Sequence, residues 1–298
     1  MNDDNEPDWA WYRSFLQVME SGSLSAAGRT LGLAQPTVGR HVDGLESALG
    51  LKLFVRSFDG FAPTDAAREL QPYAASIAAS AAALRRVASS HGSGVRGVVR
   101  VTASEIVGVE VLPPILVDLR ERHPELVVEL VLSNRADDLL RREADIAVRM
   151  FRPVQDALVA RRVGDIALGL HAHPRYLARA GTPASPADLA AHTLVGFDRE
   201  TEFIRRVRDR FQGVTRELFA LRADSDVAQL AAIRAGFGIG FCQVALARRD
   251  GLVRVLPDAV SASLDTWVAM HEDLRESPRC AATFDALVAG LGRHVNAG

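Results

Sequence analysis

The sequence predicts an α/β protein of several domains, in which a helical N-terminal part precedes a longer part of alternating strands and helices. At 298 residues the chain is long enough for two or three separate hydrophobic cores. Helical spacing dominates as far as a glycine-containing joint at His91 to Gly94, and beyond it short apolar strands alternate with amphipathic helices. These observations together indicate a multi-domain chain with one early domain boundary.

Composition and charge exclude several classes of protein. Hydrophobic residues make up 48% and charged residues 24%, and the formal net charge is −2, so any nucleic-acid contact must come from a local surface. The two cysteines, Cys242 and Cys280, lie far apart and outside metal-ligand spacing, which fits a reducing compartment. The N-terminus MNDDNEPDW lacks signal-peptide features, and no apolar run could span a bilayer. We therefore expect a soluble, cytoplasmic protein with no membrane partner.

The N-terminal part is predicted to hold three short helices and a small hairpin. Trp11, Phe15 and Met19 recur at helical spacing, a second helix begins near Ser25, and Gly32 ends it. The third helix is expected from Pro36 to Leu49, with a stop at Gly50. After it, the segment 51–55 alternates like a strand and leads into a turn at 58–60.

The third helix has two different faces. One carries an apolar stripe, at spacings of 4, 3 and 4, formed by Val38, Val42, Leu45 and Leu49. The other carries side chains that can hydrogen-bond, namely Gln35, Thr37, Arg40 and, on the flank, His41. Two short helices separated by Gly32-Leu33-Ala34 have the form of a helix-turn-helix, whose second helix enters the major groove of DNA. An ordinary three-helix packing unit with a polar solvent face is the alternative.

The residue types of the polar face suit base and phosphate contacts. Gln35 can pair with an adenine edge, Arg40 with guanine or a phosphate, and Thr37 with a thymine methyl or a phosphate. Pro36 suits the first helical turn, where no intrahelical N–H bond is due.

The segment Asp65 to Ser90 is alanine-rich and is predicted to form one long helix, with Pro72 near its start as a candidate kink. A narrow apolar stripe runs along it, formed by Leu70, Tyr73, Ile77, Leu84 and Val87. We interpret this stripe as a dimerisation seam, with packing on its own domain as the alternative.

Beyond the joint, strands are expected at 98–101, 127–132, 146–148, 166–170, 239–241 and 267–270. Helices are expected at 109–122, 136–142, 227–235 and 280–295. Alternation of this kind predicts parallel, doubly wound sheets. Two sets of alternating strands and helices predict two lobes with a cleft for a small ligand between them.

Polar residues follow several predicted strands, where such a ligand would lie. Ser104 precedes a helix beside free backbone N–H groups, a natural seat for a carboxylate, whereas Glu105 could cap that helix, oppose an anion or accept a cation. The other members of this candidate effector set are Ser133, Arg149, Phe151, Phe203, Asp224 and Ser225. Each could alone be a loop or capping residue, but as a set we interpret them as ligand contacts.

The stretch SLSAAGRTLGLAQPTVGRHVDGLESALGLKLFVRS resembles the DNA-binding domain of the LysR-type transcriptional regulators. The similarity continues through PTDAA into the long helix, the family's linker helix. Later, LPPILVDLRERHPELVVELVL and ADIAVR resemble the start of the family's effector-binding domain, and RAGFGIGFC resembles a late helix-strand corner.

The resemblance implies a winged helix-turn-helix over residues 1–65, a linker and dimerisation helix over 66–92, and an effector-binding domain over 93–298. That domain would be two-lobed like periplasmic solute-binding proteins, with lobe I at about 93–162 and 267–298 and lobe II at about 163–266. It implies a regulator that binds double-stranded promoter DNA as a dimer, or as a tetramer built from two dimers. A small-molecule effector and RNA polymerase are the further partners implied; catalysis and cofactors are not.

By position, the resemblance carries the major-groove role to Gln35, Pro36, Thr37, Arg40 and His41. Ser25 would contact a phosphate, Arg56 would reach the minor groove or the backbone, and Thr64 would cap the linker helix. The sequence departs from the family's usual residues at Gly28, Ala34, Gly39, Phe58, Asp59 and Ala67. Because phosphate contacts dominate affinity, these departures predict weaker backbone binding and more reliance on the oligomer.

Two other functions remain open from the sequence. One is an architectural or constitutive repressor without an effector response, and the other is a cytoplasmic solute-binding protein or enzyme whose N-terminal part only mediates assembly. The motif GFGIGF lacks the order and spacing of a nucleotide-binding loop, and His171 and His173 have no third metal ligand near them in sequence.

Overall fold

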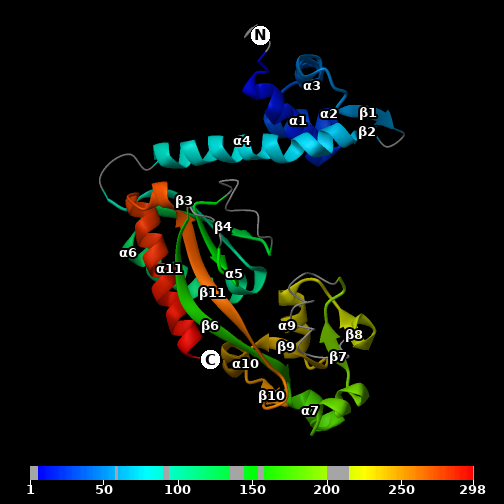
Figure 1. The fold of residues 1–298 in the computed structure, drawn as a ribbon, viewed down its shortest axis with the longest axis vertical. Coiled ribbons are helices and arrows are strands. Elements are labelled where there is room, and N and C mark those ends of the chain that lie inside the picture. The colour runs from blue at the N-terminus through cyan, green and yellow to red at the C-terminus, as the bar shows by residue number, and fades with distance from the viewer. Residues whose placement is uncertain are drawn as a thin grey trace. The chain divides into compact units, whose positions relative to one another are not determined.

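The computed structural model describes residues 6–57, 60–89, 94–134, 144–153, 158–199 and 215–297 (Figure 1). The described residues form two compact units, one extending through Arg85 and the other beginning at Arg86. The boundary between the two units therefore lies within one helix.

The described part of the first unit contains three short helices, a two-stranded hairpin and most of a longer fourth helix. The helices are α1 (Trp9–Ser21), α2 (Leu24–Leu31) and α3 (Gln35–Leu49), and the strands are β1 (Phe54–Ser57) and β2 (Gly60–Pro63). Val38, Val42 and Leu45 are buried with Phe15 of α1, and Leu49 packs against the same core. The predicted apolar stripe of α3 is thus confirmed as its core-facing side.

The hairpin begins later than the sequence pattern indicates. β1 starts at Phe54 rather than at Leu51, because the backbone N–H groups of Leu53 and Phe54 donate to the carboxylate of Glu46. β1 and β2 pair antiparallel, with Phe54 opposite Pro63 and Arg56 opposite Phe61. Phe58 and Asp59, the predicted turn, lie outside the described residues.

The long helix is α4 (Asp65–Ser89), which continues past Pro72. Thr64 Oγ1 accepts the N–H of Ala67 at 3.2 Å, as the predicted capping role requires. Tyr73 and Leu84 are about 70% exposed, and Ile77 and Val87 are also exposed. Leu70 differs from the predicted seam, because it packs against the core of the first unit beside Ala67 and Ala74.

The second unit is built on one nine-stranded mixed sheet, not on separate parallel sheets (Figure 1). Its strands are β3 (Gly97–Ala103), β4 (Leu126–Leu132), β5 (Ile146–Arg149), β6 (Leu158–Ala172), β7 (Leu194–Gly196), β8 (Phe219–Arg222), β9 (Ile239–Gln243), β10 (Val253–Val255) and β11 (Ser261–His271). Their order is β4-β3-β5-β11-β6-β9-β7-β8, and β10 pairs with β6. Parallel pairs occur toward both ends, β3 with β4 and β5, and β7 with β8 and β9.

Two long antiparallel strands join these parallel groups. β6 and β11 pair along the whole of β11, from Ser261 opposite Gly169 to His271 opposite Leu158. The sequence predicted only short buried segments of each strand. Charged residues at exposed positions, such as Arg161 and Arg162, interrupt the apolar pattern by which a strand is recognised. The register shifts between Thr266 and Trp267, where the proposed boundary between the two lobes also falls.

Helices cover the sheet of the second unit. They are α5 (Glu105–Glu110), α6 (Leu112–Arg122), α7 (Pro174–Ala180), α9 (Asp226–Arg234), α10 (Val244–Arg249) and α11 (Pro278–Asn296), with short 3-10 turns at Pro186–Ala191, Arg216–Leu218 and Glu272–Leu274.

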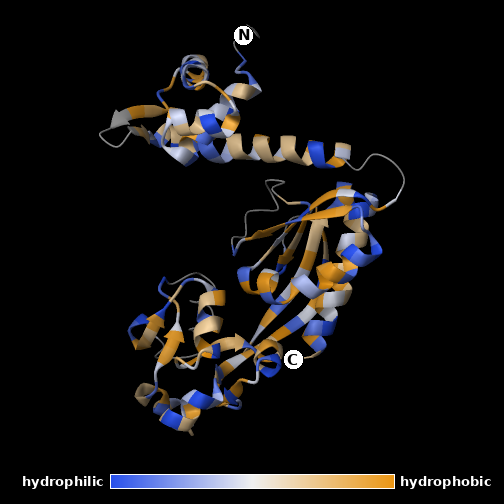
Figure 2. Ribbon diagram, turned by 180° about the vertical axis from the view of Figure 1, so that it is seen from behind, coloured by the Kyte–Doolittle hydropathy of each residue, from blue (hydrophilic) through white to orange (hydrophobic). Residues whose placement is uncertain are grey.

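The expected helix at 109–122 is divided at Val111, because the two prolines that follow cannot donate backbone hydrogen bonds. The predicted helix at 136–142 lies outside the described residues. Hydrophobic residues concentrate on the strands, and the outer helices are mixed (Figure 2).

A buried ion pair anchors the last turn of α4 to this sheet. Arg86 Nε and Nη2 donate to the two carboxylate oxygens of Asp145 at 2.9 and 3.0 Å. Asp145 Oδ2 also accepts the backbone N–H of Arg100 at 2.9 Å. Because a buried charge is tolerated only when it is paired and hydrogen-bonded, this pair ties the end of α4 to β3 and β5.

Replacement of Arg86 by alanine should loosen the segments of β3 and β5 that Asp145 holds together. An uncompensated buried carboxylate costs about 3–5 kcal/mol, so backbone amides of β3 and β5 should exchange hydrogen markedly faster in Arg86→Ala. Arg85→Ala, at the exposed neighbouring position, is the matched control. Equal exchange in the two variants would contradict this role for the pair.

Two glycines of the first unit should respond oppositely to alanine. A Cβ at Gly39 would lie 3.8 Å from Leu24 Cδ1, so Gly39→Ala should raise the free energy of unfolding by about 0.5–1 kcal/mol. A Cβ at Gly28 would lie 2.7 Å from the backbone oxygen of Leu33, so Gly28→Ala should lower the melting temperature. Calorimetry of both variants measures the signs, and a stabilised Gly28→Ala would refute this packing argument.

Candidate functional site

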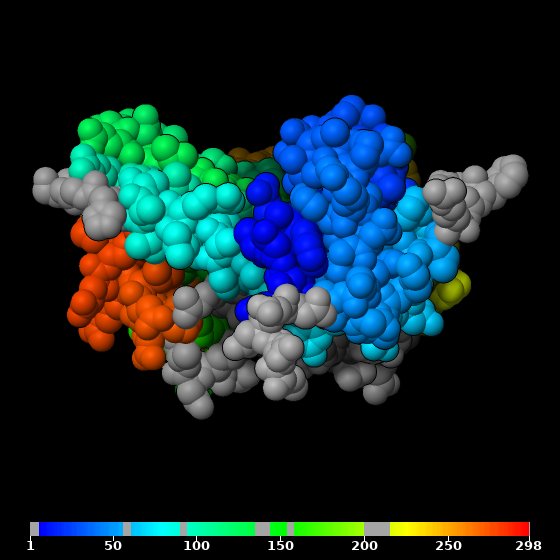
Figure 3. Space-filling view, turned by 90° about the horizontal axis from the view of Figure 1, so that it is seen from above, coloured from blue at the N-terminus to red at the C-terminus, as the bar shows by residue number. Residues whose placement is uncertain are grey.

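The polar face of α3 is available to a ligand of the first unit. Gln35, Pro36 and Arg40 are exposed, and Thr37 is partly exposed. Arg40 Nη2 donates to Thr37 Oγ1 at 3.4 Å, so these two side chains lie on the same stretch of surface. In the space-filling view the residues of this unit, in shades of blue, form a compact lobe (Figure 3). The arrangement leaves hydrogen-bonding groups on the N-terminal turns of α3, which are the turns that meet base edges in a helix-turn-helix.

The start of α3 has no hydroxyl cap. Ala34 occupies the N-cap position and offers no side-chain hydrogen bond, while Pro36 stands within the first turn. The first N–H groups of α3 therefore depend on a partner other than the capping side chain.

His41 has a partner within the protein. Its Nδ1 lies 2.8 Å from the hydroxyl oxygen of Ser14, a buried residue of α1. This hydrogen bond holds α3 against α1 and commits one ring nitrogen, so only Nε2 is left for a DNA contact. The sequence pattern could not have revealed Ser14, because the two residues are 27 positions apart.

The two remaining DNA candidates lie on other elements. Ser25 is exposed in the first turn of α2, whereas Ser23 is the N-cap and accepts the N–H of Ala26 at 3.4 Å. Ser25 is therefore not needed to cap its own helix. Arg56 is on β1, opposite Phe61 of β2.

In the second unit, the sheet brings several members of the effector set to one edge. Ala103, at the end of β3, pairs with Leu132 of β4 and Val148 of β5. Ser104, Ser133 and Arg149 therefore lie together at the carboxyl ends of neighbouring parallel strands, the usual place for a ligand in such sheets.

A second group of residues meets this edge through α9. Ser225 Oγ donates to Glu105 Oε1 at 2.9 Å, which joins the N-terminus of α9 to that of α5. The N–H of Glu105 donates to Asn134 Oδ1 at 3.1 Å. Free backbone N–H groups were expected at this helix start for a carboxylate ligand, but for the N–H of Glu105 the protein itself supplies the acceptor.

The local charge at these helix starts is negative. Reduced hydration raises the pKa of Asp226, and the negative charge of Glu105 raises it further, to about 6. Ser104 Oγ is buried, and among the described residues it has no hydrogen-bond partner. A ligand here would thus meet one unused hydroxyl and two carboxylates.

The other predicted effector residues differ in what they do. Arg149 is buried, and its Nη2 donates to Thr102 Oγ1 at 3.1 Å. Asp224 Oδ1 accepts the N–H groups of Asp198 and Arg199, so it stabilises a turn. Phe151 is exposed, and Phe203 lies outside the described residues.

A network of two arginines and two acids also joins α5 to α9 and α10. Arg234 Nη1 and Nη2 donate to Glu110 at 2.7 and 2.8 Å, and its Nε donates to Asp250 at 2.7 Å. Arg249 pairs with both acids as well. The hydrogen bond from Arg234 is the main reason that the pKa of Glu110 falls to about 2, against the opposing effect of burial. No local spacing in the sequence pointed to these partners.

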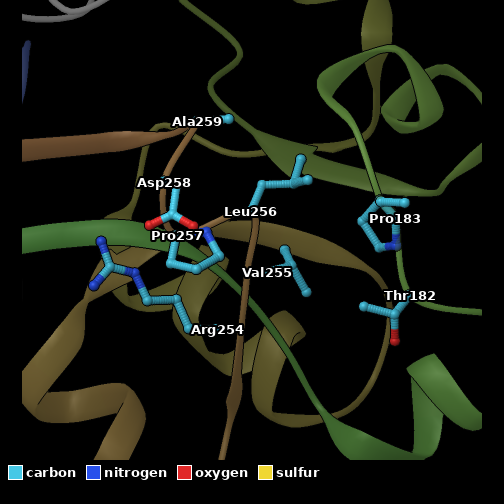
Figure 4. A pocket seen from close by; sticks show the side chains of 9 residues that line it. Thr182, Pro183, Arg254, Val255, Leu256, Pro257, Asp258 and Ala259 are labelled. Carbon is cyan, nitrogen blue, oxygen red and sulfur yellow. The ribbon is translucent and has the colours of Figure 1, made fainter.

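A pocket of about 280 Å³ lies between the segment after α7 and the turn that joins β10 to β11 (Figure 4). Val255 and Leu256 are nearest to Thr182 and Pro183 in this view, and Arg254 lies farther away. The described effector residues are not among those that line it. This pocket is therefore separate from the strand ends discussed above.

The cysteines and histidines set aside in the sequence have structural surroundings. Cys242 and Cys280 are buried free thiols, and burial raises the pKa of Cys242 to about 12, so its thiol is not activated. His173 accepts the N–H of Arg175 at the start of α7. Within the described ranges there is no cluster of metal-ligating side chains, and no helix is long and apolar enough to cross a membrane.

These features define a helix-turn-helix protein that also carries an α/β domain with polar groups at its strand ends. A model of the bacterial regulatory helix-turn-helix protein, lysR family, matches residues 9–68, and a model of the LysR substrate binding domain matches residues 92–292. The chain belongs to the LysR family of transcriptional regulators.

Curated relatives carry regulator names. A HTH-type transcriptional regulator of Xanthomonas campestris pv. campestris is 33% identical over 60% of this chain and 52% of its own length. The regulator CrgA of Neisseria meningitidis serogroup C is 33% identical over 61% of each chain. The probable regulator LtrA of Klebsiella pneumoniae is 28% identical over 92% of this chain and 91% of its own. The chain thus spans between half and two thirds of the first two relatives.

Solved structures share the fold. CbnR, a LysR family transcriptional regulator, aligns with a TM-score of 0.70 at 20% identity, covering 95% of this chain and 99% of its own. The full-length virulence activator AphB of Vibrio cholerae aligns with a TM-score of 0.62 at 21% identity over the same shares. Full-length CbnR has also been solved in a complex with its target DNA, with a TM-score of 0.65, 20% identity and coverage of 97% of this chain and 99% of its own.

Proposed function

We propose that this LysR-family chain binds double-stranded promoter DNA through the exposed face of α3. We further propose that its effect on transcription changes when a small effector binds to the second unit. The observation that carries the proposal is the division of α3 into a buried apolar side and an exposed side of Gln35, Pro36, Thr37 and Arg40. A purely structural helix has no need of this set at its N-terminal turns, whereas base recognition does.

Phosphate and wing contacts complete the proposed DNA surface. Ser25 and Arg56 would hold the backbone on either side of α3, and His41 would use the nitrogen that Ser14 leaves unoccupied. Because phosphate contacts supply much of the affinity, binding should weaken steeply with salt.

The exposed side of α4 supports a proposal of self-association. Tyr73, Ile77, Leu84 and Val87 are large apolar residues on a helix, and burial against a second copy would remove them from water. We propose a dimer through this seam and a tetramer of two dimers in the cytoplasm. RNA polymerase is the partner through which the bound regulator would act.

For the effector we propose the edge formed by Ser104, Ser133 and Arg149, approached by Glu105 and Ser225. The buried hydroxyl of Ser104 supports this placement, because it lacks a partner among the described residues. Phe151 is exposed beside this edge and could cover a ligand.

A mobility shift with the DNA upstream of the chain's own gene, at stated salt, tests DNA binding. Arg40→Ala and Arg56→Ala should each weaken binding by about 1–3 kcal/mol while the oligomeric state is retained. Arg122→Ala, which removes the same charge from an exposed position on α6, is the control.

Leu84→Asp should give monomers and reduce the shift. Unchanged binding in both arginine variants would refute the assigned surface, and no shift with any neighbouring promoter fragment would refute the function.

Thermal-shift screening of small acids, amines and neutral metabolites tests the effector response. A compound at about 100 times its dissociation constant stabilises the folded state by about 2.7 kcal/mol, a measurable rise in melting temperature. The rise should be smaller in Ser104→Ala and unchanged in Ser263→Ala, a control at an exposed position on β11. An equal rise in both variants would place the ligand elsewhere, and no rise with any compound would favour a constitutive DNA-binding protein.

A further inference from the structure

Glu46 is a carboxylate in the core of the first unit. It lies on α3 beside the apolar stripe, and its side chain is only 7% exposed. A buried carboxylate is costly unless charged and hydrogen-bonding partners compensate for the lost water. Its partners therefore show what the residue does.

Among the described residues, the side-chain partners of Glu46 come from one short segment. Oε1 accepts the N–H groups of Leu53 at 2.8 Å and Phe54 at 3.2 Å, and Oε2 pairs with the ammonium of Lys52. Burial acts to raise the pKa of Glu46, but the hydrogen bonds from Lys52, Leu53 and Phe54 outweigh it and the net pKa is lowered. The ionised carboxylate is thus matched to this segment.

The same segment is held from its other side by Thr64. Thr64 Oγ1 donates to the backbone oxygen of Lys52 at 2.8 Å and accepts the N–H of Ala67, the third residue of α4, at 3.2 Å. Residues 52–54 are therefore fixed to α3 through a carboxylate and to the start of α4 through a hydroxyl. β1, which begins at Phe54, cannot shift without breaking these bonds.

We propose that Glu46 is a positioning residue for DNA binding, which sets the wing formed by β1 and β2 at a fixed place relative to α3. The inference rests on the proposed function, because it assumes that α3 and the wing residue Arg56 contact the same DNA. Two contacts on one rigid unit bind together without a further loss of conformational freedom, whereas a mobile wing would have to be ordered on each encounter.

The test is a double-mutant cycle on promoter binding. Glu46→Gln should weaken binding about tenfold, in the range shown by coupled neighbours. Because Glu46 acts through the wing, Glu46→Gln combined with Arg56→Ala should bind no more weakly than Arg56→Ala alone. Combined with Gln35→Ala, a contact of α3, the two losses should instead multiply. Multiplied losses in both pairs, or unchanged binding in Glu46→Gln, would overturn the proposal.

Charge and folding are controlled separately. Asp65→Asn removes the same charge from a carboxylate that is 97% exposed, and it should leave the affinity unchanged. Circular dichroism and oligomeric state monitor folding. If Glu46→Gln fails to fold, Thr64→Val replaces it in the cycle, because it loosens the same segment from the α4 side. Its loss of affinity should likewise not add to that of Arg56→Ala.

Salt dependence gives a second readout. Removal of one phosphate contact lowers the slope of log affinity against log salt by about 1, so Arg56→Ala and Glu46→Gln should each lower it, and their combination should lower it no further. If the unmodified protein shifts no promoter fragment, the proposed function fails. If it binds and the cycle is additive, only the role of Glu46 fails.

Discussion

The antiparallel pairing of β6 with β11 is the interaction on which the second unit depends. These two strands run side by side and connect the parallel strands at one end of the sheet with those at the other (Figure 1). Their inner residues, among them Ile166, Leu264 and Val268, belong to the same core as β3 and β5. Without this pairing the residues of α5 and α9 would have no common frame, and the contact between Glu105 and Ser225 would not form.

Buried carboxylates supply the second level of organisation. Glu46 accepts two backbone N–H groups and Asp145 accepts one, and each carboxylate pairs with a cation, one in each unit. Each joins a helix to the backbone of a neighbouring strand or segment. Such pairs give little net stability compared with apolar packing, but the position of every partner is defined, because a displaced partner would leave a buried charge unpaired.

The proposed function uses both arrangements. The DNA surface requires α3 and the wing to keep one geometry, and the effector edge requires the ends of three strands to meet. At that edge the chain provides acidic groups and the Ser104 hydroxyl, which has no partner in the part of the chain that the structure describes, and Asn134 accepts the N–H of Glu105. The surroundings therefore differ from a simple anion seat.

The sequence by itself determined the helical N-terminal unit, the two faces of α3, the long helix and the apolar stripe along it. These follow from local periodicity and capping, as the buried Val38 and Val42 and the cap at Thr64 illustrate. Only the tertiary structure decided the mixed sheet, the packing of Leu70 against the first unit's core, and the partners of His41, Glu46 and Asp145. The physical reason is distance along the chain: periodicity reports which side of an element is buried, whereas Ser14 with His41 and Arg86 with Asp145 meet only because packing brings remote residues together.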